Sequence, residues 1–174
     1  MKDSWFGDSY DIVKRYFISE LKAIGYHVVF DPSFMTEMND AEQFYRFVGA
    51  SDLHEGKTGK TAIVLDPDTG IGKKRRKTTH VSVACIVEKT DKYNIVPTFD
   101  QSFSWSTSNQ KQMERKLTEI RKRGRYGFYY NSHASFLLFV FMRSWTVNRS
   151  LLSASYSTLR SSRRACVTLK RSWN

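Results

Sequence analysis

The sequence predicts an α/β fold: a mostly parallel sheet with helices on both faces, forming one domain that precedes a basic tail. Its 174 residues suit one domain with a sizeable core. Segments of helical periodicity alternate with short apolar runs, as in parallel sheets built from strand–helix–strand units. Three of the apolar runs end in aspartate, over residues 28–31, 62–66 and 97–100. Open α/β sheets place their sites at the carboxyl ends of strands, so these aspartates mark the predicted site.

The chain is organised around residues 61–70. Four apolar residues, from Ala62 to Leu65, run directly into Asp66-Pro67-Asp68-Thr69-Gly70. A continuous apolar run of this length predicts a strand over 61–66 that is buried on both faces. The proline and the glycine then end the strand and turn the chain. Two carboxylates therefore follow a buried strand directly.

A helix is predicted before the first strand. Asp8 or Ser9 is its N-cap, and Gly25 follows its last residue. Apolar residues recur at three- and four-residue intervals between them, which predicts one buried face. The cations of this helix, Lys14 among them, are expected to face solvent. The segment also brings Asp8 and Asp11 toward the sheet, although capping accounts for Asp8 without any chemistry.

The other elements follow from periodicity and turn residues. Residues 80–92 fit either a strand, from their β-branched content, or a helix, from the spacing of Val83, Ile86 and Val87. A helix is chosen because parallel strands on either side need a crossover. The remaining predictions are a strand at 26–30, a short helical or irregular segment at 41–48, a strand at 94–99, a helix at 108–123, and a strand pair at 126–130 and 135–141.

Charge is distributed unevenly along the chain. Residues 1–119 hold seventeen Lys or Arg and seventeen Asp or Glu, whereas the remainder holds eleven cations and no carboxylate, which accounts for the net charge of +11. Such a basic block favours a polyanion such as nucleic acid as binding partner. The alternative is a solvated basic tail without a partner. A run of five cations, predicted to contact nucleic-acid phosphates, follows the 66–70 turn: Lys73, Lys74, Arg75, Arg76 and Lys77.

The predicted domain spans residues 1–142, and the Ser/Arg-rich tail spans 143–174. The tail shows no period, so it is predicted to be disordered or to be a non-native reading-frame product. The amino terminus carries no apolar leader, and the longest apolar stretch is too short for a bilayer. Cys85 and Cys166 form no disulfide framework. These features predict a soluble cytoplasmic protein without a membrane partner.

Carboxylates form the candidate metal site. If the strands are parallel, Asp31, Asp66, Asp68 and Asp100 converge, and Mg²⁺ or Mn²⁺ would relieve their repulsion. The alternative is that these residues cap turns and helices. His133, between two apolar runs, is a candidate general base or phosphate contact, or a turn residue. The predicted catalytic residues are therefore Asp66, Asp68, Asp100 and His133.

The order of elements around Asp66-Pro67-Asp68-Thr69-Gly70 resembles the second half of Rossmann-type methyltransferases that act on nucleic acid. The adenine-modifying members carry Asp-Pro-Pro and an aromatic residue at this turn. The segment 7–14 also resembles the opening of small bacterial ribosomal-RNA adenine methyltransferases. The resemblance implies a Rossmann-like fold over residues 5–141, with S-adenosylmethionine as cofactor. The glycine-rich loop that accepts this cofactor in the family has no counterpart after the first strand.

Three functions remain open from the sequence. The first is a divalent-metal-dependent nuclease that uses the aspartates at strand ends. The second is a reduced methyltransferase with Asp66-Pro67 near the accepting base. The third is a nucleic-acid-binding protein whose carboxylates are structural.

Overall fold

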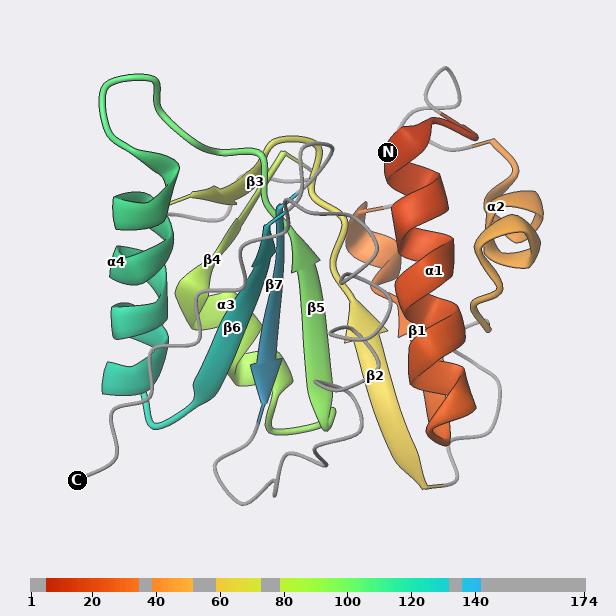
Figure 1. The fold of residues 1–174 in the computed structure, drawn as a ribbon. Helices are drawn as coiled ribbons and strands as arrows, with labels where there is room; N and C mark the ends of the chain where they lie inside the picture. The colour runs from red at the N-terminus through yellow and green to blue at the C-terminus, as the bar shows by residue number, and fades with distance from the viewer. Residues whose placement is uncertain (1–5, 35–38, 52–58, 73–78, 132–135, 142–174) are drawn as a thin grey trace, which may run out of the picture.

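The computed structural model describes residues 6–34, 39–51, 59–72, 79–131 and 136–141. Within these ranges the fold is mixed α/β, with helices and strands alternating along much of the chain (Figure 1). The helices are α1 (Ser9–Ala23), α2 (Ala41–Val48), α3 (Val83–Lys89) and α4 (Asn109–Lys122), with a 3₁₀ turn at Pro32–Phe34. The strands are β1 (Tyr26–Phe30), β2 (Lys60–Val64), β3 (Gly70–Gly72), β4 (His80–Ser82), β5 (Ile95–Phe99), β6 (Tyr126–Asn131) and β7 (Phe136–Phe141).

The main sheet has five strands in the order β1-β2-β5-β7-β6. β1 pairs with β2 and β2 with β5 in parallel, whereas β7 lies antiparallel between β5 and β6. β1, β2, β5 and β6 therefore run in one direction, and their carboxyl ends form one edge of the sheet, called the carboxyl edge below. A separate ribbon pairs β3 with β4 in parallel.

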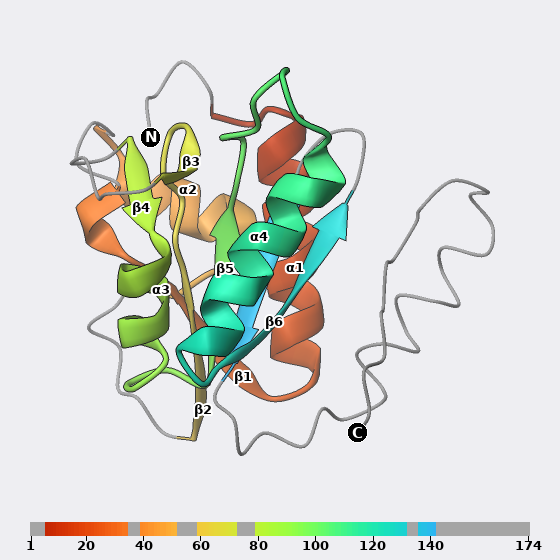
Figure 2. The same cartoon turned by 90° about the vertical axis from the view of Figure 1, so that its left-hand side faces the viewer.

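Helices cover both faces of the main sheet. α1 and α2 pack on one face, against side chains that include Val28, Phe30 and Val64. α3 and α4 lie on the other face, against Val29, Ile63 and their neighbours. Figure 2 shows α4 in front of the sheet and α1 behind it. Adjacent residues along a strand point to opposite faces, so each central strand contributes to both cores and reads as a continuous apolar run.

The predicted α/β class, with its mostly parallel sheet and helices on both faces, is confirmed. The last two strands pair as predicted, and their pairing is antiparallel. Asp8 is the N-cap of α1 and accepts hydrogen bonds from two backbone amides. Residues 83–89 are helical as predicted, but His80–Ser82 is a strand, because it pairs with β3. The expectation that Lys14 faces solvent is wrong, because its side chain is buried between two carboxylates.

None of the helices in the described ranges is both long enough and apolar enough to cross a membrane. The predicted basic tail, residues 143–174, lies outside the described residues.

Candidate functional site

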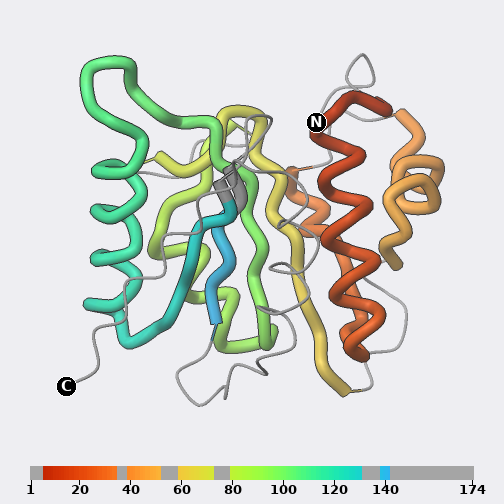
Figure 3. The backbone as a smooth tube through the Cα atoms, in the orientation of Figure 1, coloured from red at the N-terminus to blue at the C-terminus, as the bar shows by residue number. Residues whose placement is uncertain are grey.

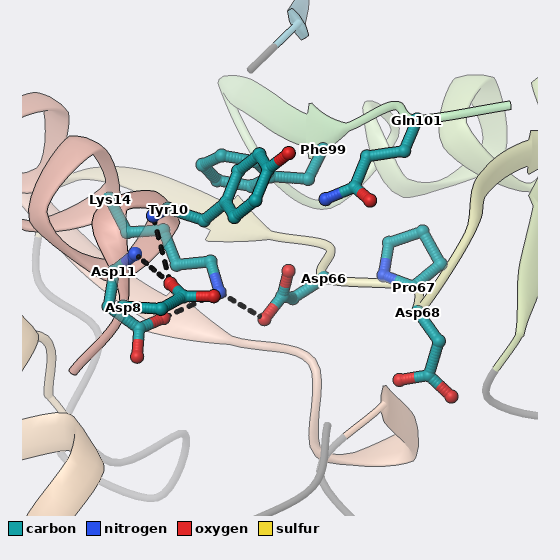
Figure 4. Close-up of a pocket in the computed structure, with 9 residues that line it drawn as sticks. All are labelled: Asp8, Tyr10, Asp11, Lys14, Asp66, Pro67, Asp68, Phe99 and Gln101. Atoms are coloured by element: carbon teal, nitrogen blue, oxygen red, sulfur yellow. Dashed lines mark hydrogen bonds and ion pairs between the residues drawn. The ribbon is translucent and has the colours of Figure 1, made fainter. Parts of the chain in front are cut away.

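A pocket of about 30 Å³ lies where the amino end of α1 meets the carboxyl ends of β2 and β5 (Figure 4). It is called the Lys14 pocket below. The residues that line it carry four carboxylates, one ammonium group, two aromatic rings and an amide: Asp8, Tyr10, Asp11, Lys14, Asp66, Pro67, Asp68, Phe99 and Gln101. This is the position at which open α/β sheets bind ligands.

Lys14 is at the centre of a buried ion triad. Its Nζ lies 2.8 Å from Asp11 Oδ1 and 2.8 Å from Asp66 Oδ2. The side chains of the lysine and the two aspartates are 6%, 1% and 9% exposed. The start of the helix explains this placement: the Asp8 cap fixes the first turn, and residues three apart share a helix face. The backbone N–H of Gly7 donates to the second oxygen of Asp11 at 2.8 Å, which holds that carboxylate in place.

The surroundings keep Lys14 charged. Burial works to lower the pKa of its ammonium group, but Asp66 and Asp11 outweigh burial and raise the pKa. The rings of Phe99 and Phe44 lie with their centroids 5.2 and 5.6 Å from Nζ, within the range of cation–π attraction. Burial raises the pKa of Asp11, an effect that Lys14 opposes. Lys14 is therefore a fixed cation near neutral pH and not a general base.

Asp66 and Asp68 both line the pocket, but they are oriented differently. Figure 4 shows the Asp66 carboxylate directed toward Lys14, whereas the Asp68 carboxylate, beyond Pro67, is directed away from it. The ion pair with Lys14 uses Oδ2 of Asp66. Asp66 is buried and Asp68 is half-buried. The two carboxylates that bracket the proline therefore share a pocket without facing each other.

Asp31 and Asp100 lie on the other face of the sheet. Phe30 and Phe99 pack on the α1 side, so the residue that follows each of them points to the α3 and α4 side. Asp31 accordingly pairs with Lys89 of α3 at 2.7 Å. Burial works to raise the pKa of Asp31, but hydrogen bonds from Lys89 and Ser33 outweigh burial and lower the pKa. The expected convergence of four carboxylates is wrong, because strand alternation sends them to two faces.

Asp100, which is fully buried, is the centre of a second network. Its Oδ2 accepts hydrogen bonds of 2.6 Å from Lys116 Nζ and from Tyr129 Oη, and its Oδ1 accepts from Ser102 Oγ at 2.6 Å and from the N–H of Ile71 at 3.0 Å. Burial and the carboxylate raise the pKa of Tyr129 well above its ordinary value. Burial lowers the pKa of Lys116, against the effect of Asp100. This network joins α4, β5 and β6 to the turn after Asp66.

Gly70 shows how closely that turn approaches the network. Its φ is +101°, which favours glycine, and a Cβ there would lie 2.5 Å from Gln101 N and 2.7 Å from Asp100 Oδ1. Asp100 therefore positions the 66–70 turn and does not line the Lys14 pocket.

Metal binding stays a prediction. Throughout the described part of the chain, no three His, Cys, Asp or Glu side chains are grouped so that they could hold an ion. Asp66 and Asp68 supply the carboxylate oxygens that Mg²⁺ and Mn²⁺ prefer, whereas Asp31 and Asp100 are each engaged by a lysine elsewhere. Any ion in the Lys14 pocket would need further ligands from water or from a substrate.

Two groups of predicted residues lie outside the described ranges. They are His133 and the basic run Lys73, Lys74, Arg75, Arg76 and Lys77. The residues that flank the basic run are held by the β3–β4 pairing, in which Gly72 pairs with Ser82. Next to this ribbon, Thr69 N–H donates to the carbonyl of Thr79 at 3.0 Å, and the Thr69 hydroxyl contacts His80. Thr79, which follows the basic run in the chain, is therefore held at Thr69, one residue beyond Asp68.

Sequence reasoning missed Lys14 as a functional residue, and it placed Asp11 near the sheet without giving it a role. The available signal was the spacing Asp8-x-x-Asp11-x-x-Lys14, which puts three ionisable residues on one face of a helix that leads into the sheet. Tyr129 and Lys116 carried no comparable signal, because only the fold brings them to Asp100.

No protein-family model, curated protein or solved structure matches the chain. The resemblance to nucleic-acid methyltransferases therefore stays a prediction. The pocket offers Lys14 as a fixed cation and Asp66 as a carboxylate with one oxygen outside the ion pair. Both lie beside two aromatic rings.

Proposed function

We propose that the protein acts on nucleic acid and that the Lys14 pocket is where it does so. The observation that carries this proposal is the buried Asp11–Lys14–Asp66 triad at the carboxyl edge. A buried ion pair gains little net stability, because desolvation offsets much of the attraction. Ionisable groups that are held this way in a cleft are concentrated at functional sites.

Charge supports nucleic acid as the substrate class. The chain carries 28 Lys or Arg against 17 Asp or Glu, and phosphate neutralisation by such cations dominates nucleic-acid affinity. Thr79, which follows the basic run Lys73–Lys77 in the chain, is hydrogen-bonded to Thr69, the neighbour of Asp68. Cations this close to Thr79 in the sequence would supply attraction to a phosphate backbone.

Phosphodiester hydrolysis with Mg²⁺ or Mn²⁺ is the preferred chemistry. Mg²⁺ is commonly held by one or two carboxylates together with the phosphates of the substrate, so Asp66, whose Oδ1 lies outside the ion pair, meets the minimum. The four carboxylates and single ammonium group of the pocket lining also favour a cation. A bound ion would neutralise phosphate charge and supply an activated water. Lys14 would fix the orientation of Asp66 through their ion pair.

Methyl transfer is the second candidate, and the aromatic rings favour it. Tyr10 and Phe99 lie beside Asp66 and Pro67 in the pocket (Figure 4). Enzymes that modify a base hold it between aromatic or apolar side chains and read its edge by hydrogen bonds. Asp66 would accept a hydrogen bond from an amino group of such a base, and S-adenosylmethionine would supply the methyl group.

One experiment separates these functions. Labelled single-stranded RNA and DNA are incubated with Mg²⁺, with Mn²⁺, or with methyl-labelled S-adenosylmethionine, and cleavage and label transfer are measured. Wild type is compared with Asp66→Asn and with the matched control Asp91→Asn, whose exposed carboxylate pairs with Arg125 outside the pocket.

We expect cleavage with a divalent ion in wild type and in Asp91→Asn, and none in Asp66→Asn. Label transfer instead of cleavage would favour the methyltransferase. Binding without either product would leave a nucleic-acid-binding protein. Equal activity in all three proteins would remove the Lys14 pocket from the reaction.

A further inference from the structure

Trp105 is a fully exposed aromatic side chain on the loop between β5 and α4. The loop, residues 101–108, leaves the carboxyl end of β5 and extends beyond the carboxyl edge before it enters α4 (Figures 1 and 3). Exposing a whole indole to water forgoes the stabilisation of about 1.5–3 kcal/mol that large apolar side chains gain on burial. The fold therefore gains no stabilisation from burial of this side chain.

The loop is held in shape by its own hydrogen bonds. The side-chain amide of Gln112, on α4, accepts from the N–H of Ser104 at 2.9 Å and donates to the carbonyls of Ser104 and Thr107 at 2.9 and 2.7 Å. The hydroxyls of Ser104 and Ser106 lie 2.8 Å apart on either side of the tryptophan. The loop thus presents the indole from an ordered backbone, and little conformational entropy is lost when a ligand binds.

The composition of the loop favours a flat, negatively charged ligand over a protein surface. The other aromatic residue, Phe103, packs inward against Tyr129 and beneath the ammonium group of Lys116. Along the chain Trp105 is flanked by serine and threonine, so the loop itself adds no apolar side chain beside it. Residues 101–113 contain one cation, Lys111, and no carboxylate. A single aromatic face on a polar loop without negative charge suits a base stacked on it, with its phosphates in solvent.

The indole is also close to the Lys14 pocket along the chain. Gln101 lines that pocket and is four residues from Trp105. Four residues span at most about 14 Å between Cα atoms. A single strand of several nucleotides can therefore reach both, since single-stranded sites cover roughly 4–16 nucleotides per binding domain.

We propose that Trp105 is a stacking platform for an unpaired base, and hence that the ligand of the carboxyl edge is single-stranded nucleic acid. This inference rests on the proposed function and specifies its substrate class. The indole face supplies sequence-tolerant stacking, and the basic residues of the chain supply the attraction to phosphate.

The test is fluorescence anisotropy with three labelled ligands of equal length: an oligothymidine single strand, its abasic backbone and a duplex. Wild type is compared with Trp105→Ala, with Trp105→Phe and with the control Tyr126→Ala, which removes an exposed aromatic residue at the opposite edge of the sheet. Thermal melting establishes that each variant is folded.

Stacking is worth about 1–3 kcal/mol per base, so Trp105→Ala should weaken binding to the single strand by roughly 5- to 150-fold. Trp105→Phe should retain most of the affinity, Tyr126→Ala should match wild type, and affinity for the abasic backbone should be the same in all four proteins.

Each other outcome overturns the proposal in a recognisable way. If wild type binds the single strand and Trp105→Ala binds it equally well, the stacking role is wrong while the proposed function stands. If Trp105→Ala also loses affinity for the abasic backbone, the tryptophan acts on the backbone or the loop instead of on a base. If wild type binds no nucleic acid, the proposed function and this inference fail together. Loss of binding to phospholipid vesicles in Trp105→Ala, without loss of oligonucleotide binding, would assign the indole to a membrane surface.

Discussion

Replacing Lys14 by methionine tests the energetics of the buried triad. Methionine matches the length of most of the lysine stem but removes the charge, so Asp11 and Asp66 are left without their shared partner. Removal of one member of a buried ion pair costs about 3–5 kcal/mol, because an uncompensated charge stays buried. All three side chains are at least nine-tenths buried, so solvent screening does not reduce this cost appreciably.

Thermal melting converts this cost into a measurable shift. For a chain of this size each kcal/mol corresponds to about 2–4 °C, so Lys14→Met should melt roughly 6–20 °C below wild type. A triple variant that carries Lys14→Met, Asp11→Asn and Asp66→Asn leaves no charge unpaired. This triple variant should regain most of the stability that Lys14→Met loses, or be more stable than wild type, as neutral replacements of buried ion networks often are.

An exposed ion pair provides the control. Arg46 and Glu42 lie 2.6 Å apart with side chains 75% and 76% exposed, so Arg46→Met should change stability by less than about 1 kcal/mol. A melting temperature of Lys14→Met within 2 °C of wild type would show that the triad is not a buried, coupled unit. A triple variant less stable than Lys14→Met would show that the charges stabilise the fold, and the energetic argument for a functional site would fail.

Three further predictions concern the carboxylates on the other face of the sheet. Measured by urea unfolding, Gly70→Ala should be markedly more destabilising than Gly124→Ala. Both glycines have a positive φ, but only a Cβ at Gly70 would meet backbone atoms and the Asp100 carboxylate. Equal losses of stability would show that this close approach does not matter. Tyr129→Phe should lower the free energy of unfolding by about 1.5–3 kcal/mol, since it deletes a buried hydrogen bond to a charged group, and a neutral result would contradict that bond. The pKa of Asp31 is lowered in the fold, so ionised Asp31 stabilises the folded state above its ordinary pKa of 3.8. This stabilisation is lost as the pH falls through the pKa that Asp31 has in the folded protein. The melting-temperature difference between wild type and Asp31→Asn should accordingly be full at pH 7 and shrink as the pH falls below 3.8.

Much of the fold could be predicted because its signals are local. Apolar runs, an N-cap at Asp8 and a glycine at position 25 reflect backbone and burial rules that act over a few residues. The strand at 80–82 was missed because pairing with β3 overrode the helical spacing of the segment.

The candidate site could be predicted only in part. The turn after β2 was identified, and Asp66 and Asp68 do line the pocket. The grouping of all four aspartates was wrong because it used strand ends without strand alternation, which decides the face that each carboxylate meets. Lys14 was missed because a lysine in an amphipathic helix ordinarily faces solvent, and only the packing of α1 against the end of β2 buries it.

The central claim, that this chain acts on nucleic acid at the Lys14 pocket, is tested most directly by amide chemical shifts. ¹H–¹⁵N spectra are recorded while a short single-stranded oligonucleotide is added to the full chain. The amides of Gly7, Tyr10 and Gln101, around the pocket, should shift and saturate together, whereas those of Gly25 and Gly124, which lie just before β1 and β6 at the opposite edge, should stay in place. Shifts confined to other surfaces, with the pocket amides unmoved at saturation, would contradict the claim.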